Sequence, residues 1–227
     1  MNKSVPLSFM LLGVLFGVCL ILSNLLATKL ITVFGLSATA GLIVFPISYI
    51  INDTIVEVWG YRKARLVIWL AFAMNFLAIA FMQLSVMIPS AAYWDGQEAY
   101  ASAFSQAPRV AFASLIAFLC GSFINAFVMS KMKIRSQGKH FGLRAVVSTL
   151  FGESADSLLF FTIAFAGIVS WENIAIMIVA ETFLKSAYEV VILPVTTFVV
   201  RYIKRTEQTD VYDEKISYNV LKIKDVS

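Results

Sequence analysis

Three apolar segments of the chain each carry polar and ionisable side chains on one helical face. In the first, Tyr49, Asp53 and Glu57 recur every four residues, with Asn52 beside them. A helix there presents one polar stripe. The second stripe consists of Glu153, Asp156, Ser157 and Phe160. The third consists of Glu181, Lys185, Tyr188 and Glu189. Lipid offers such groups no partner, so we expect all three stripes to face the interior of a helix bundle.

The chemistry of these stripes follows from their charge balance. The segments hold six carboxylates (Asp53, Glu57, Glu153, Asp156, Glu181 and Glu189) and one deeply placed lysine, Lys185. Lys185 can pair with a glutamate four residues away on either side. The carboxylates cannot all be ionised in a dry environment, so some must bind a proton, face water, or meet a cationic or hydrogen-donating ligand. A transport pathway satisfies all three requirements.

The composition independently indicates a membrane protein. Of 227 residues, 59% are apolar or aromatic and 14% are charged, and the mean hydropathy is +0.82. A soluble domain carries roughly 25% charged residues. These values argue against a soluble enzyme, a nucleic-acid-binding protein and a disordered chain. We therefore interpret the net charge of +4 as a sign of basic loops.

Six segments are long and apolar enough to cross a bilayer, because a hydrocarbon core about 30 Å thick needs roughly 20 residues of helix. The predicted spans are Leu7 to Leu26, Gly35 to Val58, Leu66 to Ile88, Val110 to Met129, Ala145 to Ser170 and Ile174 to Val200. The first is too long for the apolar part of a signal peptide and has no small-residue cleavage site after it. The sequence therefore predicts an all-α polytopic membrane protein with six transmembrane helices.

The basic residues of the loops predict its orientation. They lie on one side of the membrane if the spans alternate: Lys3, Arg62, Lys63, Arg65, Lys131, Lys133, Arg135, Lys139, Arg144, Arg201, Lys204 and Arg205. The loops of the other side carry Asp95, Glu98 and Glu172, with Lys29 and Arg109 at span ends. Lys and Arg resist translocation, so we expect both termini to be cytoplasmic.

Outside the spans little chain remains. Residues 1–205 are predicted to form the six-helix transmembrane domain, and residues 206–227 a polar cytoplasmic tail that is poorly ordered. Cys19 and Cys120 lie inside spans, and His140 has no partner at ligand spacing. We expect no disulfide, no metal site and no cofactor.

The order of the polar residues indicates weak internal symmetry. Asn24 and Asn125 lie toward the ends of the first and fourth spans, and the second and fifth spans both carry acidic stripes. Two halves of three spans each would be related by inversion across the membrane, so we expect a 3+3 inverted repeat. Pro46 and Pro194 are predicted to interrupt the second and sixth spans near the polar stripes, either as broken helices or as simple kinks.

Three strings of residues resemble a known family. They are PISYIINDTIVEVWGYRKAR (Pro46 to Arg65), STLFGESADSLLFF (Ser148 to Phe161) and KSAYEVVILP (Lys185 to Pro194), with APR (Ala107 to Arg109) and KMK (Lys131 to Lys133) between them. In order and spacing they are similar to the YhhQ-like queuosine precursor transporters, also grouped as vitamin uptake transporters. The resemblance runs from about Asn24 to Val200.

The resemblance implies a six-span transporter of the bacterial inner membrane that imports 7-cyano-7-deazaguanine and related 7-deazaguanines. Its partners would be that small molecule and the lipid bilayer, with no nucleic acid, and a homo-oligomer is left open. The donor edge of a guanine-like base suits an ionised carboxylate, and its plane suits an aromatic face. The substrate-binding residues are predicted to be Asn52, Asp53, Glu57, Glu153, Asp156, Ser157, Phe160, Lys185, Tyr188 and Glu189.

Other functions stay open at this point. The sequence has no phosphate-binding GxxxxGK[ST] motif, so uptake would rely on a proton carried by Glu57 or Glu181, on metabolic trapping of the base, or on the ATPase partners of an energy-coupling-factor transporter. Carboxylate oxygens could instead serve a cation transporter. An intramembrane enzyme is disfavoured, since there is no HExxH motif and no Ser paired with a base.

Overall fold

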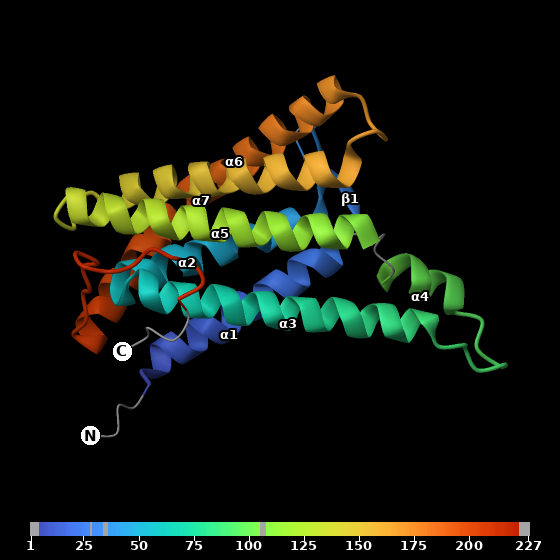
Figure 1. Ribbon diagram of the computed structural model, residues 1–227, viewed down its shortest axis with the longest axis horizontal. Helices are drawn as coiled ribbons and strands as arrows, with labels where there is room; N and C mark the ends of the chain where they lie inside the picture. Colours follow the sequence, from blue (N-terminus) through green and yellow to red (C-terminus); the bar gives the residue numbers. More distant parts are fainter. Residues whose placement is uncertain (1–4, 28, 34–35, 105–107, 223–227) are drawn as a thin grey trace.

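The computed structural model describes residues 5–27, 29–33, 36–104 and 108–222, and Figure 1 shows the path of the chain. The helices are α1 (Leu7–Leu26), α2 (Phe45–Trp59), α3 (Tyr61–Met87), α4 (Gln97–Phe104), α5 (Pro108–Arg135), α6 (Phe141–Phe165) and α7 (Trp171–Glu207). Between α1 and α2 lie the antiparallel strands β1 (Leu30–Val33) and β2 (Leu36–Thr39), followed by the 3-10 helix η1 (Ala40–Ile43). Apart from this small hairpin, the regular secondary structure of the described chain is helical, as predicted.

Five segments of the described chain are long and apolar enough to cross a membrane. They are Leu7–Leu26, Ala40–Trp59, Tyr61–Met87, Gln97–Arg135 and Phe141–Phe165. The first coincides with the predicted span. The sixth predicted span falls in α7, which is not among the five. Glu181, Lys185 and Glu189 lower the apolarity of α7 but lie on its buried face. Val179, Val191 and Phe198 are exposed on the other face. These exposed apolar residues support a sixth crossing, which stays a prediction.

The second predicted span differs from the structure at its beginning. Gly35 lies outside the described residues, and the chain then forms β2 and η1 before α2 begins at Phe45. Pro46 sits in the first turn of α2 and does not interrupt it. The N–H groups of the first helical turn make no hydrogen bond within the helix, so the N–H that proline lacks is not needed there. Pro194 lies inside α7, which continues to Glu207, so neither proline breaks a helix.

The long helices run back and forth between two ends of the molecule (Figure 1). One end holds the β1–β2 hairpin, α4 and the α6–α7 turn. The other holds the start of α1, the α2–α3 junction, the α5–α6 turn and the end of α7. The predicted cytoplasmic basic residues belong to this second end, except for Lys3, which lies outside the described residues. We refer to it as the basic end. The arrangement agrees with alternating spans, while the side of the membrane and the inverted repeat stay predictions.

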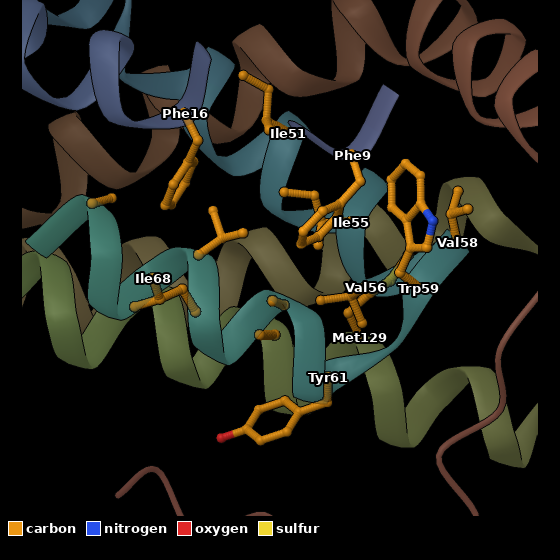
Figure 2. Packing of buried hydrophobic residues seen from close by; sticks show 14 of the residues in the cluster. Phe9, Phe16, Ile51, Ile55, Val56, Val58, Trp59, Tyr61, Ile68 and Met129 are labelled. Carbon is orange, nitrogen blue, oxygen red and sulfur yellow. The ribbon is translucent and has the colours of Figure 1, made fainter. Parts of the chain in front are cut away.

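Apolar side chains from α1, α2, α3 and α5 form a buried core near the basic end. Ile55, Val56 and Ile68 are completely buried there, and Figure 2 shows them among the packed side chains of α2 and α3. Phe9 of α1 packs edge-on against Trp59, with ring centroids 5.3 Å apart. This core fixes α2, and therefore the polar stripe on its other face.

Two glycines let α5 and α6 approach closely. A Cβ atom on Gly121 would lie 2.9 Å from the carbonyl oxygen of Gly152 and 2.9 Å from the Cβ of Asp156, and would also meet the Tyr49 hydroxyl. Backbone atoms and a helix-bound Cβ cannot move aside cheaply. This contact sets the position of Asp156 relative to α5.

We expect Gly121→Val to lower the stability of the protein by about 1–3 kcal/mol, because it overpacks this contact. The measurement is thermal unfolding of the purified protein in detergent. Gly13→Ala is the matched control, since a Cβ there would meet only Val67 Cγ2 at 3.7 Å, an ordinary contact. Equal melting temperatures for Gly121→Val and the wild type would contradict the close approach.

The tail is ordered over its described part, contrary to the sequence prediction. Residues 208–222 cross the basic end, and Asp213 is 5% exposed. Asp213 accepts hydrogen bonds from the backbone N–H of Tyr61 (2.8 Å) and the hydroxyl of Ser130 (2.6 Å). Arg65 and Trp69 donate to tail carbonyls. These buried bonds attach the tail to α3 and α5, which its polar composition does not reveal.

Candidate functional site

A lysine enclosed by acidic side chains lies between α6 and α7. The Nζ of Lys185 is 3.1 Å from a Glu153 oxygen, 3.2 Å from an Asp156 oxygen and 3.8 Å from a Glu181 oxygen. All four side chains are buried. The same Nζ lies 4.0 Å from the centre of the Phe45 ring. Three carboxylates share one ammonium group, so this cluster retains capacity for a further hydrogen-bond donor or cation.

A pocket opens beside this cluster, between the end of α1, η1, α2 and the three helices α5, α6 and α7. Of the predicted site residues, Asp156, Ser157, Phe160 and Lys185 line it. Glu153 does not line it but holds Lys185. The pocket lies toward the hairpin end of the molecule, because Thr39 and Gly41 also form its wall.

One wall of the pocket was not predicted as part of the site. Asn24 and Ser114 line it, and the Ser114 hydroxyl donates to Oδ1 of Asn24 at 2.7 Å. Nδ2 of Asn24 donates to Oδ1 of Asn75 at 3.0 Å. A lone Asn or Ser inside a span is usually a bond between helices, and these residues do make such bonds. Phe45 is a further wall residue, which the sequence did not single out.

A second polar group lies along α2 and outside the pocket wall. Asn52 donates to the Ser122 carbonyl oxygen at 3.1 Å and to Oδ1 of Asn125 at 2.7 Å. Asp53 accepts a hydrogen bond from the Ser148 hydroxyl at 3.3 Å. Asn52 and Asp53, predicted to bind substrate, therefore bond to α5 and α6 instead of lining the pocket.

The third polar stripe is divided in the structure. Lys185 and Glu181 reach the pocket. Glu189 is buried beside Asp53. Tyr188 is partly exposed and is not in the pocket wall. The spacing along α7 thus serves two separate polar groups.

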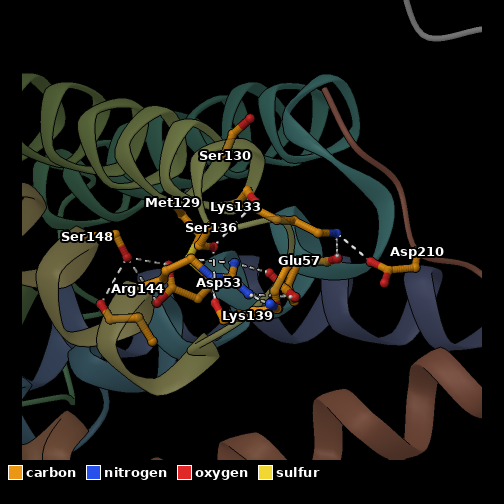
Figure 3. A network of polar contacts seen from close by, with 12 residues as sticks. Asp53, Glu57, Met129, Ser130, Lys133, Ser136, Lys139, Arg144, Ser148 and Asp210 are labelled. Carbon is orange, nitrogen blue, oxygen red and sulfur yellow. Dashed lines mark hydrogen bonds and ion pairs between the residues drawn. The ribbon is translucent and has the colours of Figure 1, made fainter. Parts of the chain in front are cut away.

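Glu57 does not line the pocket and belongs to the polar network at the basic end (Figure 3). Its carboxylate accepts two hydrogen bonds from Arg144, one of them 3.0 Å long, and pairs with Lys204 at 2.6 Å. Lys204 also meets Asp210 of the tail at 2.8 Å, and Lys133 meets Asp210 at 2.6 Å. We call these five residues the ion-pair cluster. They join α2, α5, α6, α7 and the tail at the basic end.

The pKa of Asp210 depends on the two lysines with which it forms ion pairs. Partial burial acts to raise the pKa of this carboxyl group, but hydrogen bonds from Lys133 and Lys204 outweigh it and hold the pKa below its ordinary value. A lowered pKa in the folded state stabilises the contact above the ordinary aspartate value, and the contribution is lost as the pH falls through the lowered pKa. The tail contact is therefore fully formed at neutral pH.

We expect Asp210→Asn to loosen the tail at neutral pH, because the amide replaces an ion pair with both lysines. Amide hydrogen exchange in residues 211–220 should become faster than in the wild type, and acidification of the wild type should have the same effect. Glu214→Gln is the matched control, since Glu214 is exposed on the same tail. Unchanged exchange in Asp210→Asn would show that Asp210 does not hold the tail.

Within the described residues, no group of three or more His, Cys, Asp or Glu side chains is arranged to hold a metal ion. The free cysteines, Cys19 and Cys120, form no disulfide there.

Comparisons with known proteins identify a family profile and several named proteins that are similar to this chain. Residues 39–199 match the profile of the family described as "Putative vitamin uptake transporter". A Bacillus subtilis (strain 168) protein named "Probable queuosine precursor transporter" is 29% identical over 185 residues, which are 81% of this chain and 80% of that protein. The Escherichia coli (strain K12) "Queuosine precursor transporter" is 32% identical over 146 residues, 63% of this chain and 62% of its own length.

A third relative, the "Probable queuosine precursor transporter" of Haemophilus influenzae, is 27% identical over 58% of this chain and 54% of its own length. No solved structure gives a significant match. The matched residues 39–199 include Lys185, its three carboxylate partners and most of the pocket wall. With 161 of its 227 residues covered by the family profile, this multi-pass membrane protein belongs to the vitamin uptake transporter family.

Proposed function

We propose that the protein imports a queuosine precursor, 7-cyano-7-deazaguanine or a related 7-deazaguanine, across the bacterial inner membrane. The names of the relatives support the substrate class. The observation that carries the proposal is the pocket in which Asp156 and Lys185 meet an aromatic wall. Related proteins are named as transporters, in agreement with the expectation that the chain is not an enzyme.

The pocket residues fit the chemistry of such a base. A guanine-like ring presents a ring N–H and an exocyclic amine side by side, and one carboxylate accepts both. Asp156 is the carboxylate of the α6 stripe in the pocket wall. Lys185 can donate to the ring carbonyl. Phe160 or Phe45 offers an aromatic face to the ring plane.

The two ends of the molecule suit alternating access. The pocket lies toward the hairpin end, whereas the ion-pair cluster and the tail close the basic end. With the basic end in the cytoplasm, release of substrate into the cell requires the Glu57 ion pairs to separate. The structure then corresponds to a state closed on the cytoplasmic side.

Uptake of radiolabelled 7-cyano-7-deazaguanine by cells that lack their own transporter tests the proposal. Wild-type protein should support uptake. Asp156→Asn should weaken it, since one charged hydrogen-bonding partner is worth about 2 kcal/mol, or about 30-fold in affinity. Glu172→Gln is the control, because Glu172 is an exposed carboxylate on α7. Uptake by the wild type no faster than by empty cells would overturn the proposal.

A further inference from the structure

A second pair of acidic side chains lies between the pocket and the ion-pair cluster. Asp53 of α2 and Glu189 of α7 are neighbours across the interface of the two helices. Their exposed fractions are 0% and 1%. Neither carboxyl oxygen of Glu189 receives a hydrogen bond from the described residues. Its polar neighbours are Asp53 and Thr149.

No cation balances this pair in the part of the chain that the structure describes. Lys185 is one helical turn from Glu189 on α7, but its ion pairs are with Glu153, Asp156 and Glu181.

Two other cationic side chains, on α6 and α7, form ion pairs with Glu57 and not with Asp53 or Glu189. They are Arg144 and Lys204. From α5 and α6 the side chains that face Asp53 are Asn125 and Ser148, which are neutral. Glu57 was one of two predicted proton carriers. Its ion pairs with Arg144 and Lys204 favour the ionised carboxylate, so it is poorly suited to bind a proton.

Two neighbouring buried carboxyl groups cannot both be ionised without a cation nearby, except at a large cost in free energy. One proton between them removes the repulsion and turns the contact into a hydrogen bond. That proton also gives the pair a hydrogen-bond donor of its own, besides the neighbouring Thr149 hydroxyl. We propose that Asp53 and Glu189 together bind the proton whose movement drives uptake, a role that rests on the proposed transport function.

Tyr49 connects this site to the pocket. Its hydroxyl is buried and makes no hydrogen bond to the described residues. Its side chain is close enough to Glu153, Asp156, Asp53 and Glu189 for each of these carboxyl groups to influence it electrostatically. Occupation of the pocket by a base that bonds to Asp156 can therefore alter the environment of the Asp53–Glu189 pair. This is the physical link that coupling requires.

Infrared spectroscopy of the purified protein tests the bound proton without any substrate. Wild-type protein at neutral pH should show the C=O stretch of a neutral carboxylic acid, with a small shift in heavy water. Asp53→Asn and Glu189→Gln should each remove or displace one component of this band, whereas Glu172→Gln should leave the whole band unchanged. A wild-type spectrum without the band, or a band that both substitutions leave unchanged, would overturn the proposal.

Vesicles containing the protein test the role in transport. A pH gradient, acidic outside, should drive accumulation of 7-cyano-7-deazaguanine by the wild type, and the gradient-driven part should be lost in Glu189→Gln. Exchange of labelled for unlabelled base should persist in Glu189→Gln, because exchange needs no net proton movement. Accumulation driven by Na⁺ alone would overturn the proton site. Accumulation driven by the pH gradient in both Asp53→Asn and Glu189→Gln would also overturn it. No exchange by the wild type would instead refute the proposed function, and the infrared result would still stand.

Discussion

Replacement of Lys185 by methionine is expected to abolish uptake of the base and to destabilise the protein. The substitution leaves Glu153, Asp156 and Glu181 buried without their shared cation. Removal of one partner from a buried ion pair costs about 3–5 kcal/mol. Uptake is lost because the carboxylates then bind protons or repel one another, and Asp156 no longer has a fixed position. Uptake in cells and thermal unfolding in detergent measure the two effects.

A triple variant separates stability from transport. Lys185→Met combined with Glu153→Gln and Asp156→Asn removes two of the three unbalanced charges, leaving Glu181, and should regain part of the stability, but no uptake. Lys185→Arg keeps the charge and should melt closer to the wild type than Lys185→Met does. If Lys185→Met melted and transported like the wild type, the acidic cluster would have no part in either property.

Arg144→Leu is expected to have the largest effect on stability at the basic end. Arg144 and Glu57 are both 1% exposed, and Arg144 makes two hydrogen bonds to Glu57. Loss of the guanidinium leaves Glu57 with Lys204 alone, which is partly exposed. We expect a loss of about 3–5 kcal/mol, the usual cost of breaking a buried pair. Thermal unfolding of the purified variant measures it.

Arg135→Leu is the matched control, because Arg135 is an exposed arginine at the end of α5 and such substitutions change stability by about 0.5 kcal/mol or less. The double variant Glu57→Leu with Arg144→Leu should be more stable than Arg144→Leu, since no buried charge is left unpaired. A melting temperature of Arg144→Leu equal to that of Arg135→Leu would contradict the ion-pair cluster.

The long helices were predictable because apolar length and helical periodicity are local properties. α1 begins and ends where the sequence predicted, and the stripe through Glu153 and Asp156 faces a helix interface as expected. The β1–β2 hairpin was not predicted, because a short apolar run fits a strand as well as a helix. The order of the tail was missed for a different reason. It depends on lysines and backbone groups far away in the sequence, such as Lys133 and the N–H of Tyr61.

The candidate site was predicted in part. Periodicity along α6 and α7 predicted Asp156, Ser157, Phe160 and Lys185, which do line the pocket. It also placed Glu57 with them, although Glu57 is four residues beyond Asp53 and bonds to Arg144, which is 87 residues away. A stripe tells which face is buried but not which partner each residue meets along it. Asn24 and Ser114 were missed because a single polar residue in a span carries no periodic signal.

The most direct test of the account is the thermal stability of the purified protein with and without 7-cyano-7-deazaguanine, with guanine and adenine as controls. A ligand that binds the folded state raises its stability by an amount set by concentration and affinity. We predict a shift with 7-cyano-7-deazaguanine that exceeds the shifts with guanine and adenine and is reduced in Asp156→Asn. An equal response to adenine, or no response from folded wild-type protein, would contradict a base-binding site at Asp156 and Lys185.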